Sequence, residues 1–387
     1  MIVTRIELEN WKNFHKCDVR LMERCFVVGA NASGKSNFLD VFRFLRDIAR
    51  TGGGLQAAVA ERGGMKKIRC LAARTKSYIS ISLTLAQTGD SDEEWKYVLA
   101  FKHVGGGIRK NEVGIIREEV FHNGDAILKR SEDAENEDSE TLKYTHLEQP
   151  TTNKDFRELK VFFDNIQYLN VVPQLVRESG SLQLSADKED YFGRNFIRRL
   201  SKLNEKTRES YFRRINEVLR LAVPQLENLS LVPDEMGVPH LEAKYIHWRA
   251  SGSKQQEEQF SDGTLRLIGF LFALIDSPGL TLLEEPESNL HSAIVSQFPE
   301  YISKIQRTRK ETRQVILTTH SFDILSNEGI SGNEVLVLTT TKEGTEVTNI
   351  NEISSIKAML KAGFTVADAV IPYSMPKGIE QMIRTVK

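Results

Sequence analysis

The sequence predicts an α/β protein with a doubly wound, mostly parallel sheet, an added antiparallel β subdomain and an inserted helical lobe. Three observations lead to this fold class. A glycine-rich segment at 29–36 lies between a short apolar run and a helical pattern. Strand-like runs alternate with helical stretches between residues 280 and 338, as in parallel sheets. In residues 68–130, short segments alternate polar with apolar residues, which is typical of antiparallel strands.

The N-terminal part leads into the glycine-rich segment. Residues 2–28 predict two short strands around 10–14, and the apolar run 25–28 ends at Gly29. Residues 29–36 read Gly-Ala-Asn-Ala-Ser-Gly-Lys-Ser, and a helix is expected from Ser36 to about Arg50. This pattern predicts a P-loop, in which backbone N–H groups bind phosphates, Lys35 reaches the β- and γ-phosphates and Ser36 holds Mg²⁺. The competing interpretation is a tight turn with a surface lysine.

Three motifs in the last third carry further candidate residues. Ser261-Asp262-Gly263 opens the apolar run 265–275, which predicts either a second phosphate-binding helix end or a plain N-cap. The buried strand 280–283 ends in Glu284 and Glu285. We expect Glu284 to support Mg²⁺ and Glu285 to orient and deprotonate the attacking water. His320 closes the next strand, where it could contact a γ-phosphate, although a lone histidine is often structural.

In this order, these segments resemble the ABC-type ATPase fold, and more narrowly the branch with RecF, the SMC proteins and the OLD-like bacterial ATPases. The resemblance covers about 1–50 and 255–325. It identifies residues 6–14 as the opening strand and turn, 29–36 as Walker A, Ser261–Gly263 as the signature, and 280–285 as Walker B. It places 288–291 at the D-loop and His320 at the switch histidine. The resemblance implies ATP as substrate, Mg²⁺ as cofactor, and the following nucleotide contacts: Lys12, Asn13, Gly29, Ala30, Asn31, Ala32, Ser33, Gly34, Lys35, Ser36, Asn37, Ser261, Asp262 and Gly263.

Two features depart from the family pattern. Glu284 stands where the family usually has aspartate, and no clear motif marks the Q-loop. We expect Gln174 to be the Q-loop glutamine, because it follows the buried strand predicted over 161–173 and precedes the helical lobe, and Gln56 and Gln87 are alternatives. The predicted metal ligands are therefore Ser36, Gln174 and Glu284, and the predicted catalytic residues are Glu285 and His320.

The domain division follows from these segments. Residues 1–180 and 250–350 are expected to form the ATPase domain with its β subdomain. Residues 181–249 are expected to form an inserted, basic helical lobe, and 351–387 closing helices. The 67 residues after His320 carry no acidic pair after a strand, so the Toprim nuclease domain of OLD-type enzymes is not expected.

The expected lobe is the most basic part of the chain. Residues 191–220 carry nine basic residues against three glutamates, or +6, in a chain whose net charge is −1. This charge predicts contacts with DNA phosphates, although a solvated face or an acidic partner would also explain it. The residues assigned to nucleic acid are Arg194, Arg198, Arg199, Lys202, Arg213 and Arg214.

The apolar composition bears on the location of the protein, and the resemblance bears on its function. No apolar run approaches the roughly 20 residues that cross a membrane, so a cytoplasmic protein is expected. The resemblance implies an ATP-sandwiched head-to-tail homodimer. We expect this dimer to be coupled to sensing of double-stranded DNA or to regulation of a separate effector or nuclease, in genome maintenance or antiphage defence. The alternatives are a RecF-like repair protein acting alone, a scaffold that holds a toxin without binding DNA, and, least favoured, a transporter subunit.

Overall fold

The computed structural model describes residues 1–74, 77–89, 91, 93–104, 112–133, 138–178, 196–248, 252–308 and 312–375. A six-stranded sheet lies at its centre, in the order β15-β14-β3-β13-β12-β8. All of its neighbouring pairs are parallel except β14 and β15. Its strands are β3 (Arg24–Gly29), β8 (Gln167–Leu169), β12 (Leu280–Glu284), β13 (Gln314–Thr319), β14 (Val335–Thr341) and β15 (Gly344–Asn349).

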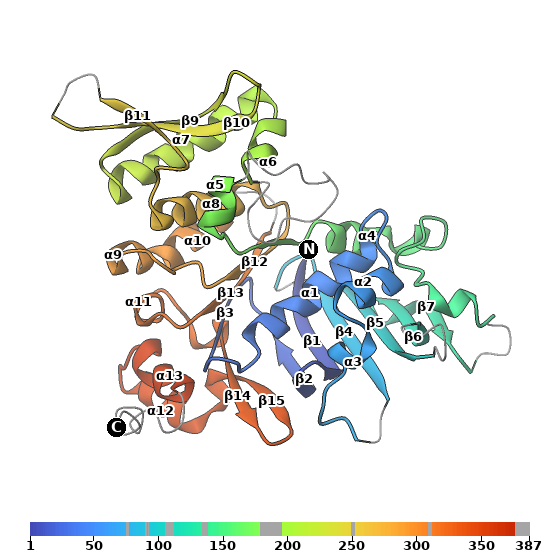
Figure 1. Ribbon diagram of the computed structural model, residues 1–387. Helices are drawn as coiled ribbons and strands as arrows, with labels where there is room; N and C mark the ends of the chain where they lie inside the picture. The colour runs from blue at the N-terminus through green and yellow to red at the C-terminus, as the bar shows by residue number, and fades with distance from the viewer. Residues whose placement is uncertain are drawn as a thin grey trace, which may run out of the picture.

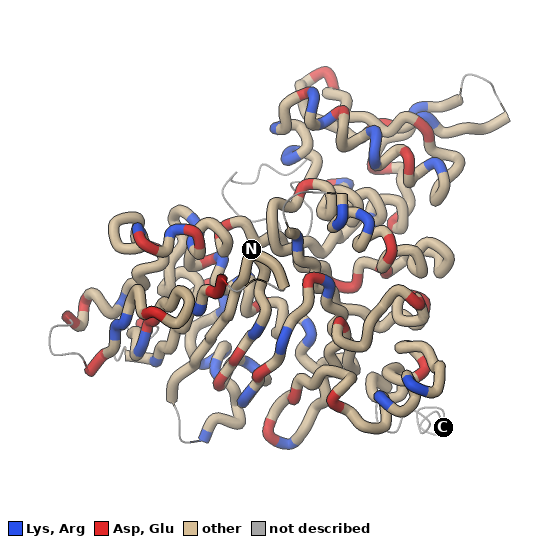
Figure 2. Tube along the Cα trace, turned by 180° about the vertical axis from the view of Figure 1, so that it is seen from behind, with Lys and Arg blue, Asp and Glu red and all other residues tan. Residues whose placement is uncertain are grey.

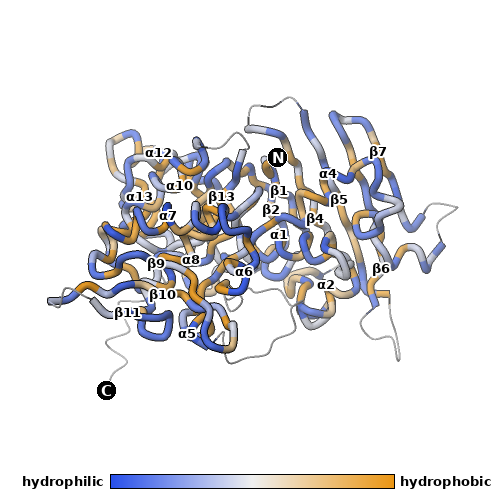
Figure 3. Tube along the Cα trace, turned by 90° about the horizontal axis from the view of Figure 1, so that it is seen from above, coloured by the Kyte–Doolittle hydropathy of each residue, from blue (hydrophilic) through white to orange (hydrophobic). Residues whose placement is uncertain are grey.

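The central sheet separates two hydrophobic cores. Along β3, Cys25 and Val27 belong to one core, whereas Phe26 and Val28 belong to the other. Because successive side chains of a strand point to opposite faces, this alternation shows that both faces of the sheet are buried, as parallel sheets require. Figure 3 shows the elements of the two cores on opposite sides of the molecule.

The first core lies between the central sheet and a six-stranded antiparallel sheet, in the order β2-β1-β4-β5-β6-β7. Helix α1 packs within this core through Phe38, Phe42 and Phe44 (Figure 1). The strands and helices of this half are β1 (Ile2–Trp11), β2 (Phe14–Arg20), β4 (Tyr78–Ala86), β5 (Glu94–His103), β6 (Val113–His122), β7 (Asp125–Ser131), α1 (Lys35–Ala49), α2 (Leu55–Glu61), α3 (Met65–Ile68) and α4 (Arg157–Asp164). The predicted antiparallel subdomain is confirmed.

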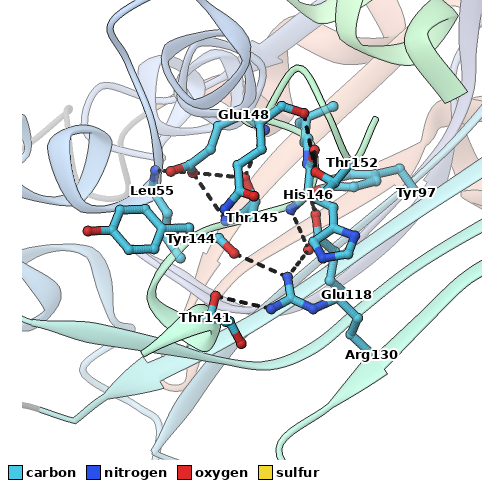
Figure 4. A network of polar contacts seen from close by, with 12 residues as sticks. Leu55, Tyr97, Glu118, Arg130, Thr141, Tyr144, Thr145, His146, Glu148 and Thr152 are labelled. Carbon is cyan, nitrogen blue, oxygen red and sulfur yellow. Dashed lines mark hydrogen bonds and ion pairs between the residues drawn. The ribbon is translucent and has the colours of Figure 1, made fainter. Parts of the chain in front are cut away.

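A buried polar network fixes the segment that follows β7 (Figure 4). Glu118 is 0% exposed and accepts hydrogen bonds from the Tyr97 hydroxyl, from Arg130 and from the backbone N–H of His146. Nearby, Glu148 accepts from the backbone N–H of Leu55 at the start of α2. Since a buried carboxylate is tolerated only when it is paired and hydrogen-bonded, these bonds fix the chain after β7 against the sheet.

The second core lies under the lobe and the C-terminal helices, with α8 at its centre (Figure 1). The helices of this half are α5 (Pro173–Arg177), α6 (Phe196–Lys202), α7 (Glu205–Ala222), α8 (Asp262–Asp276), α9 (Ser292–Val295), α10 (Phe298–Arg307), α11 (Phe322–Leu325), α12 (Ser354–Lys361) and α13 (Val366–Ser374). The last two lie within 351–387, for which the sequence predicts closing helices, and residues 376–387 are outside the described part of the chain.

The structure differs from the sequence analysis in two elements. The lobe is not only helical, because it also carries an antiparallel sheet, in the order β11-β10-β9, with strands β9 (Leu226–Pro233), β10 (Pro239–Tyr245) and β11 (Ser253–Gln256). The run 161–173, expected to be one buried strand, is the end of α4 followed by β8. Leu159, Phe162 and Phe163 have helical spacing, and such a short apolar run fits either structure.

Candidate functional site

The glycine-rich segment joins the end of β3 to the start of α1, as a P-loop does. Gly34 has φ = 101°, and a Cβ atom there would lie 1.9 Å from Asn13 Nδ2, so only glycine fits. The loop therefore places its backbone at the N-terminus of a 15-residue helix, where N–H groups and the helix dipole favour phosphate.

Asn13 holds this loop in place from the turn between β1 and β2. Its Nδ2 donates to the Ser33 carbonyl at 2.9 Å and to Thr345 Oγ1 at 2.7 Å, and Thr345 Oγ1 donates to the same carbonyl at 2.8 Å. The Nδ2 of Asn37 donates to Asn13 Oδ1 at 2.8 Å. Lys12 forms an ion pair with Asp40 of α1 at 2.6 Å. In this arrangement Lys12, Asn13 and Asn37 contact protein, and their nucleotide contacts stay a prediction.

The ammonium of Lys35 lies within the site and is largely buried. It donates to the Gly29 carbonyl at 3.2 Å and lies 3.7 Å from Glu285 Oε1. It also contacts Nε2 of His320. Burial lowers the pKa of Lys35, and the charges of Glu285 and Glu284 act in the opposite direction. A buried ammonium is stable only when it is paired with negative charge, so Lys35 is suited to bind an anionic ligand.

Glu285 and His320 meet because their strands are neighbours. Glu285 follows β12 with φ = 41°, and its backbone N–H donates to the Thr318 carbonyl of β13 at 3.1 Å. Glu285 Oε1 lies 3.1 Å from His320 Nε2, and the hydrogen bond with His320 is the main cause that lowers the pKa of Glu285. The same Nε2 contacts Lys35, so it either accepts from Lys35 or donates to Glu285.

The candidate metal ligands Ser36 and Glu284 also meet. The Ser36 hydroxyl donates to Glu284 Oε1, and the Tyr168 hydroxyl donates to Glu284 Oε2. Burial is the main cause that raises the pKa of Tyr168, followed by the charge of Glu284. Hydroxyl and carboxylate oxygens are the ligands that Mg²⁺ prefers, so this pair fits the ion. The described residues hold no group of three or more His, Cys, Asp or Glu side chains that could bind a metal.

Gln174 forms a hydrogen bond with the signature motif. Its amide donates to Asp262 Oδ2 at 3.4 Å, so the structure places it beside the signature motif, and its role as a metal ligand stays a prediction. Of the alternatives, Gln56 donates to the carbonyls of Val113 and Lys143, which makes it part of the antiparallel subdomain. Gln87 directly follows β4.

The signature motif forms the N-terminus of α8. Ser261 caps the helix by accepting from the Thr264 N–H at 3.1 Å, and Asp262 pairs with Arg177 at 2.6 Å. A Cβ atom on Gly263 would lie 2.4 Å from the carbonyl oxygen of Asn289, so a larger residue would push the D-loop away. The signature and the D-loop of one chain therefore pack together.

The predicted nucleic-acid residues divide into exposed and structural ones. Arg194 lies outside the described residues. Arg199 pairs with Asp276 at 2.7 Å and lies over the Phe272 ring, which gives it a structural role in joining α6 to α8. The remaining ones form no ion pair within the described part of the chain: Arg198, Lys202 and Arg213 are exposed, and Arg214 is partly buried. Figure 2 shows basic and acidic residues interspersed over the lobe.

Sequence reasoning missed three residues around the site: Tyr168, Thr345 and Glu287. Glu287 Oε1 accepts from Thr319 Oγ1 at 2.6 Å and from the His320 N–H at 3.2 Å, which fixes the loop that carries His320. Burial raises the pKa of Glu287. Its position two residues after Glu285 was a usable signal, because carboxylates at a strand end face the same crevice. Tyr168 and Thr345 carried no such signal.

The fold and the site together define a P-loop ATPase with the architecture of an SMC head. The head from "Crystal structure of the SmcHead bound to the C-winged helix domain of ScpA" matches at TM-score 0.56 and 16% identity, covering 90% of this chain and 98% of that one. The Smc head with an extended coiled coil from Pyrococcus furiosus matches at TM-score 0.50 and 14% identity, covering 94% and 100%. At these identities the similarity shows the fold alone.

The family follows from the sequence. Residues 25–326 match the family described as "AAA domain, putative AbiEii toxin, Type IV TA system". This match spans most of the chain, so the protein belongs to that family of AAA-domain ATPases. A search of curated proteins gave no match. In the described residues, every helix is too short or too polar to cross a membrane. The predicted ABC-type ATPase fold, in the form of an SMC head, is confirmed.

Proposed function

We propose that this protein binds ATP at the P-loop and hydrolyses it at the ends of β12 and β13. One observation carries the proposal: Lys35, Glu285 and His320 contact one another, and the adjacent residues Ser36 and Glu284 contact each other, although they come from three distant segments of the chain. The P-loop backbone and Lys35 bind the phosphates, and Ser36 with Glu284 would hold Mg²⁺. The ion, when bound, neutralises phosphate charge. Glu285 accepts the proton of the attacking water, and His320 contacts the γ-phosphate.

The contact between Lys35 and Glu285 adds a feature to this proposal. The phosphates and Glu285 compete for the same ammonium, because Glu285 Oε1 already lies 3.7 Å from Lys35 Nζ. Phosphate binding would release Glu285 toward the attacking water. We therefore expect nucleotide entry to break the ion pair between Lys35 and Glu285, so that Glu285 can act as the general base.

The catalytic unit that we propose is a head-to-tail dimer. Ser261 caps its own α8, and the resemblance implies that it contacts the nucleotide on the P-loop of the other protomer. The test is to mix two variants, Lys35→Ala and Ser261→Arg, that are each inactive alone. The mixture should regain turnover, because the Lys35→Ala protomer supplies an intact signature to the P-loop of its partner. No recovery at any mixing ratio would contradict the shared site.

The output that we propose is control of a partner effector in response to DNA, in genome maintenance or antiphage defence. The family description, which names a toxin–antitoxin system, supports an effector. The exposed lobe residues Arg198 and Arg213 support phosphate contacts. A RecF-like protein that acts alone and a toxin-holding scaffold without DNA binding are the alternatives.

The lobe variant Arg198→Ala/Arg213→Ala distinguishes the two hypotheses that include DNA binding from the scaffold hypothesis. Its matched control is Lys357→Ala/Lys361→Ala, which removes two exposed charges from α12. We expect only the lobe variant to lose duplex-stimulated turnover, with basal turnover intact. Wild-type turnover that does not respond to duplex would favour the scaffold, and equal stimulation of both variants would contradict the role of Arg198 and Arg213 in DNA contacts.

A further inference from the structure

Glu284 stands where the ABC-type family usually has aspartate, and the structure shows which side chains fix the position of its carboxylate. Each carboxylate oxygen accepts from one hydroxyl: Oε1 from Ser36 and Oε2 from Tyr168. Ser36 belongs to α1 and Tyr168 to β8, so the carboxylate is held from two sides by elements that are far apart in the chain.

Tyr168 is itself rigidly placed. Strand β8 pairs in parallel with β12, with Tyr168 opposite Leu282 and Leu169 opposite Leu283. The ring is 7% exposed and lies 4.3 Å from the guanidinium carbon of Arg43, which projects from α1. Arg43 lies 3.7 Å from Asp40 of the same helix. A ring packed between a strand and a cation cannot turn its hydroxyl away from Glu284 without breaking these contacts.

Glutamate needs such a partner more than aspartate does. It has one more methylene and one more rotatable bond, so a free glutamate at the end of β12 samples more positions than aspartate. A fixed outer donor orients a ligating carboxylate, and loss of such a partner typically weakens metal affinity about 10–100-fold. In this site, Tyr168 is the outer hydrogen-bond donor to the carboxylate of Glu284.

We propose that Tyr168 is a positioning residue for Mg²⁺, whose hydroxyl fixes the carboxylate of Glu284 beside Ser36. The inference rests on the proposed ATP site, and it assigns to β8 a function that the P-loop motifs do not reveal. It also explains how glutamate can serve at position 284: the hydroxyl constrains the additional methylene.

The test uses the full chain and a fluorescent ATP analogue, titrated with Mg²⁺ and separately measured in EDTA. Tyr168→Phe removes only the hydroxyl. We expect it to raise the Mg²⁺ concentration for half-maximal binding about 10–100-fold and to leave binding in EDTA unchanged. The matched control is Tyr78→Phe, which removes a hydroxyl that donates to Glu9 Oε2 at 3.0 Å in the antiparallel sheet. The control should keep the wild-type Mg²⁺ dependence.

A double variant makes the test specific. In Glu284→Asp the shorter side chain cannot reach both hydroxyls, so adding Tyr168→Phe should cause no further shift. A wild-type Mg²⁺ dependence in Tyr168→Phe, or an equal shift in both backgrounds, would overturn the inference. Failure of the wild-type protein to bind the analogue at all would instead overturn the ATP site.

Discussion

The hydroxyl of Thr345 should be required for a stable P-loop, and Thr345→Val removes it with little change in shape. Thr345 is 3% exposed and lies at the start of β15, more than 300 residues from the loop in the chain. Its hydroxyl donates to the Ser33 carbonyl at 2.8 Å and accepts from Asn13 Nδ2 at 2.7 Å. Valine preserves the packing and deletes both hydrogen bonds.

The expected cost follows from the bonds that remain. Each lost hydrogen bond costs about 1 kcal/mol, and a buried partner left unsatisfied costs about 1–3 kcal/mol. The Ser33 carbonyl and Asn13 Nδ2 keep their mutual hydrogen bond of 2.9 Å, so neither group is left without a hydrogen-bond partner. We therefore expect a loss of about 2 kcal/mol in unfolding free energy. If the whole of this free energy favours an open P-loop that cannot bind ATP, the apparent Kd for ATP rises at most about 30-fold.

Two measurements check this prediction: the urea midpoint, and the affinity for a fluorescent ATP analogue. The matched control is Thr348→Val on the same hairpin, since the described part of the chain shows no hydrogen bond from the Thr348 hydroxyl. We expect a lower midpoint and weaker binding in Thr345→Val alone. Changes within about 0.5 kcal/mol of wild type, the usual range for surface substitutions, would refute the reasoning.

Three further predictions concern the site. Glu285→Gln should bind ATP at least as tightly as wild type and accumulate as a closed dimer without turnover, and normal hydrolysis in rapid-quench assays would exclude Glu285 as the base. Lys35→Ala should abolish binding of the fluorescent analogue, and unchanged affinity would contradict the P-loop assignment. Asp40→Asn, which removes the charge of the buried carboxylate that pairs with Arg62 and Lys12, should cost about 3 kcal/mol in unfolding free energy at pH 7.

The cost of Asp40→Asn should depend on pH. Burial acts to raise the pKa of Asp40, but Arg62 and Lys12 together hold it below its usual value. A lowered pKa means that the ionised carboxylate stabilises the fold above the pKa of unfolded aspartate, about 3.9, and that this stabilisation is lost as pH falls through the lower folded pKa. Urea midpoints of variant and wild type should therefore converge in strong acid, and a constant difference would contradict the ion pair.

The sequence was sufficient to predict those parts of the site that are defined by one short segment of the chain. The P-loop fixes its own strand, turn and helix, and β12 and β13 each end directly at a candidate residue. Because the carboxyl ends of neighbouring parallel strands meet at one edge, Glu285 and His320 could be placed together before the structure was known. The α/β class and the antiparallel subdomain followed from the period of their apolar residues.

The remaining parts depend on contacts between distant segments. Nothing near Thr345 indicates that the β14–β15 hairpin reaches the P-loop, and Tyr168 reads as an ordinary strand residue. Arg199 counts as a basic residue in the sequence, but only the fold shows that it pairs with Asp276. The apolar run ending in Phe162 and Phe163 was ambiguous because its neighbours, rather than its composition, decide between helix and strand.

The most direct test of the account is steady-state ATP turnover per protomer, measured over a wide range of protein concentration with and without duplex DNA. The account predicts that turnover per protomer rises with concentration and then levels off, since the site needs the signature of a second chain. DNA should shift this rise to lower concentration at low salt. Turnover per protomer that is independent of concentration, or absent throughout, would contradict the account.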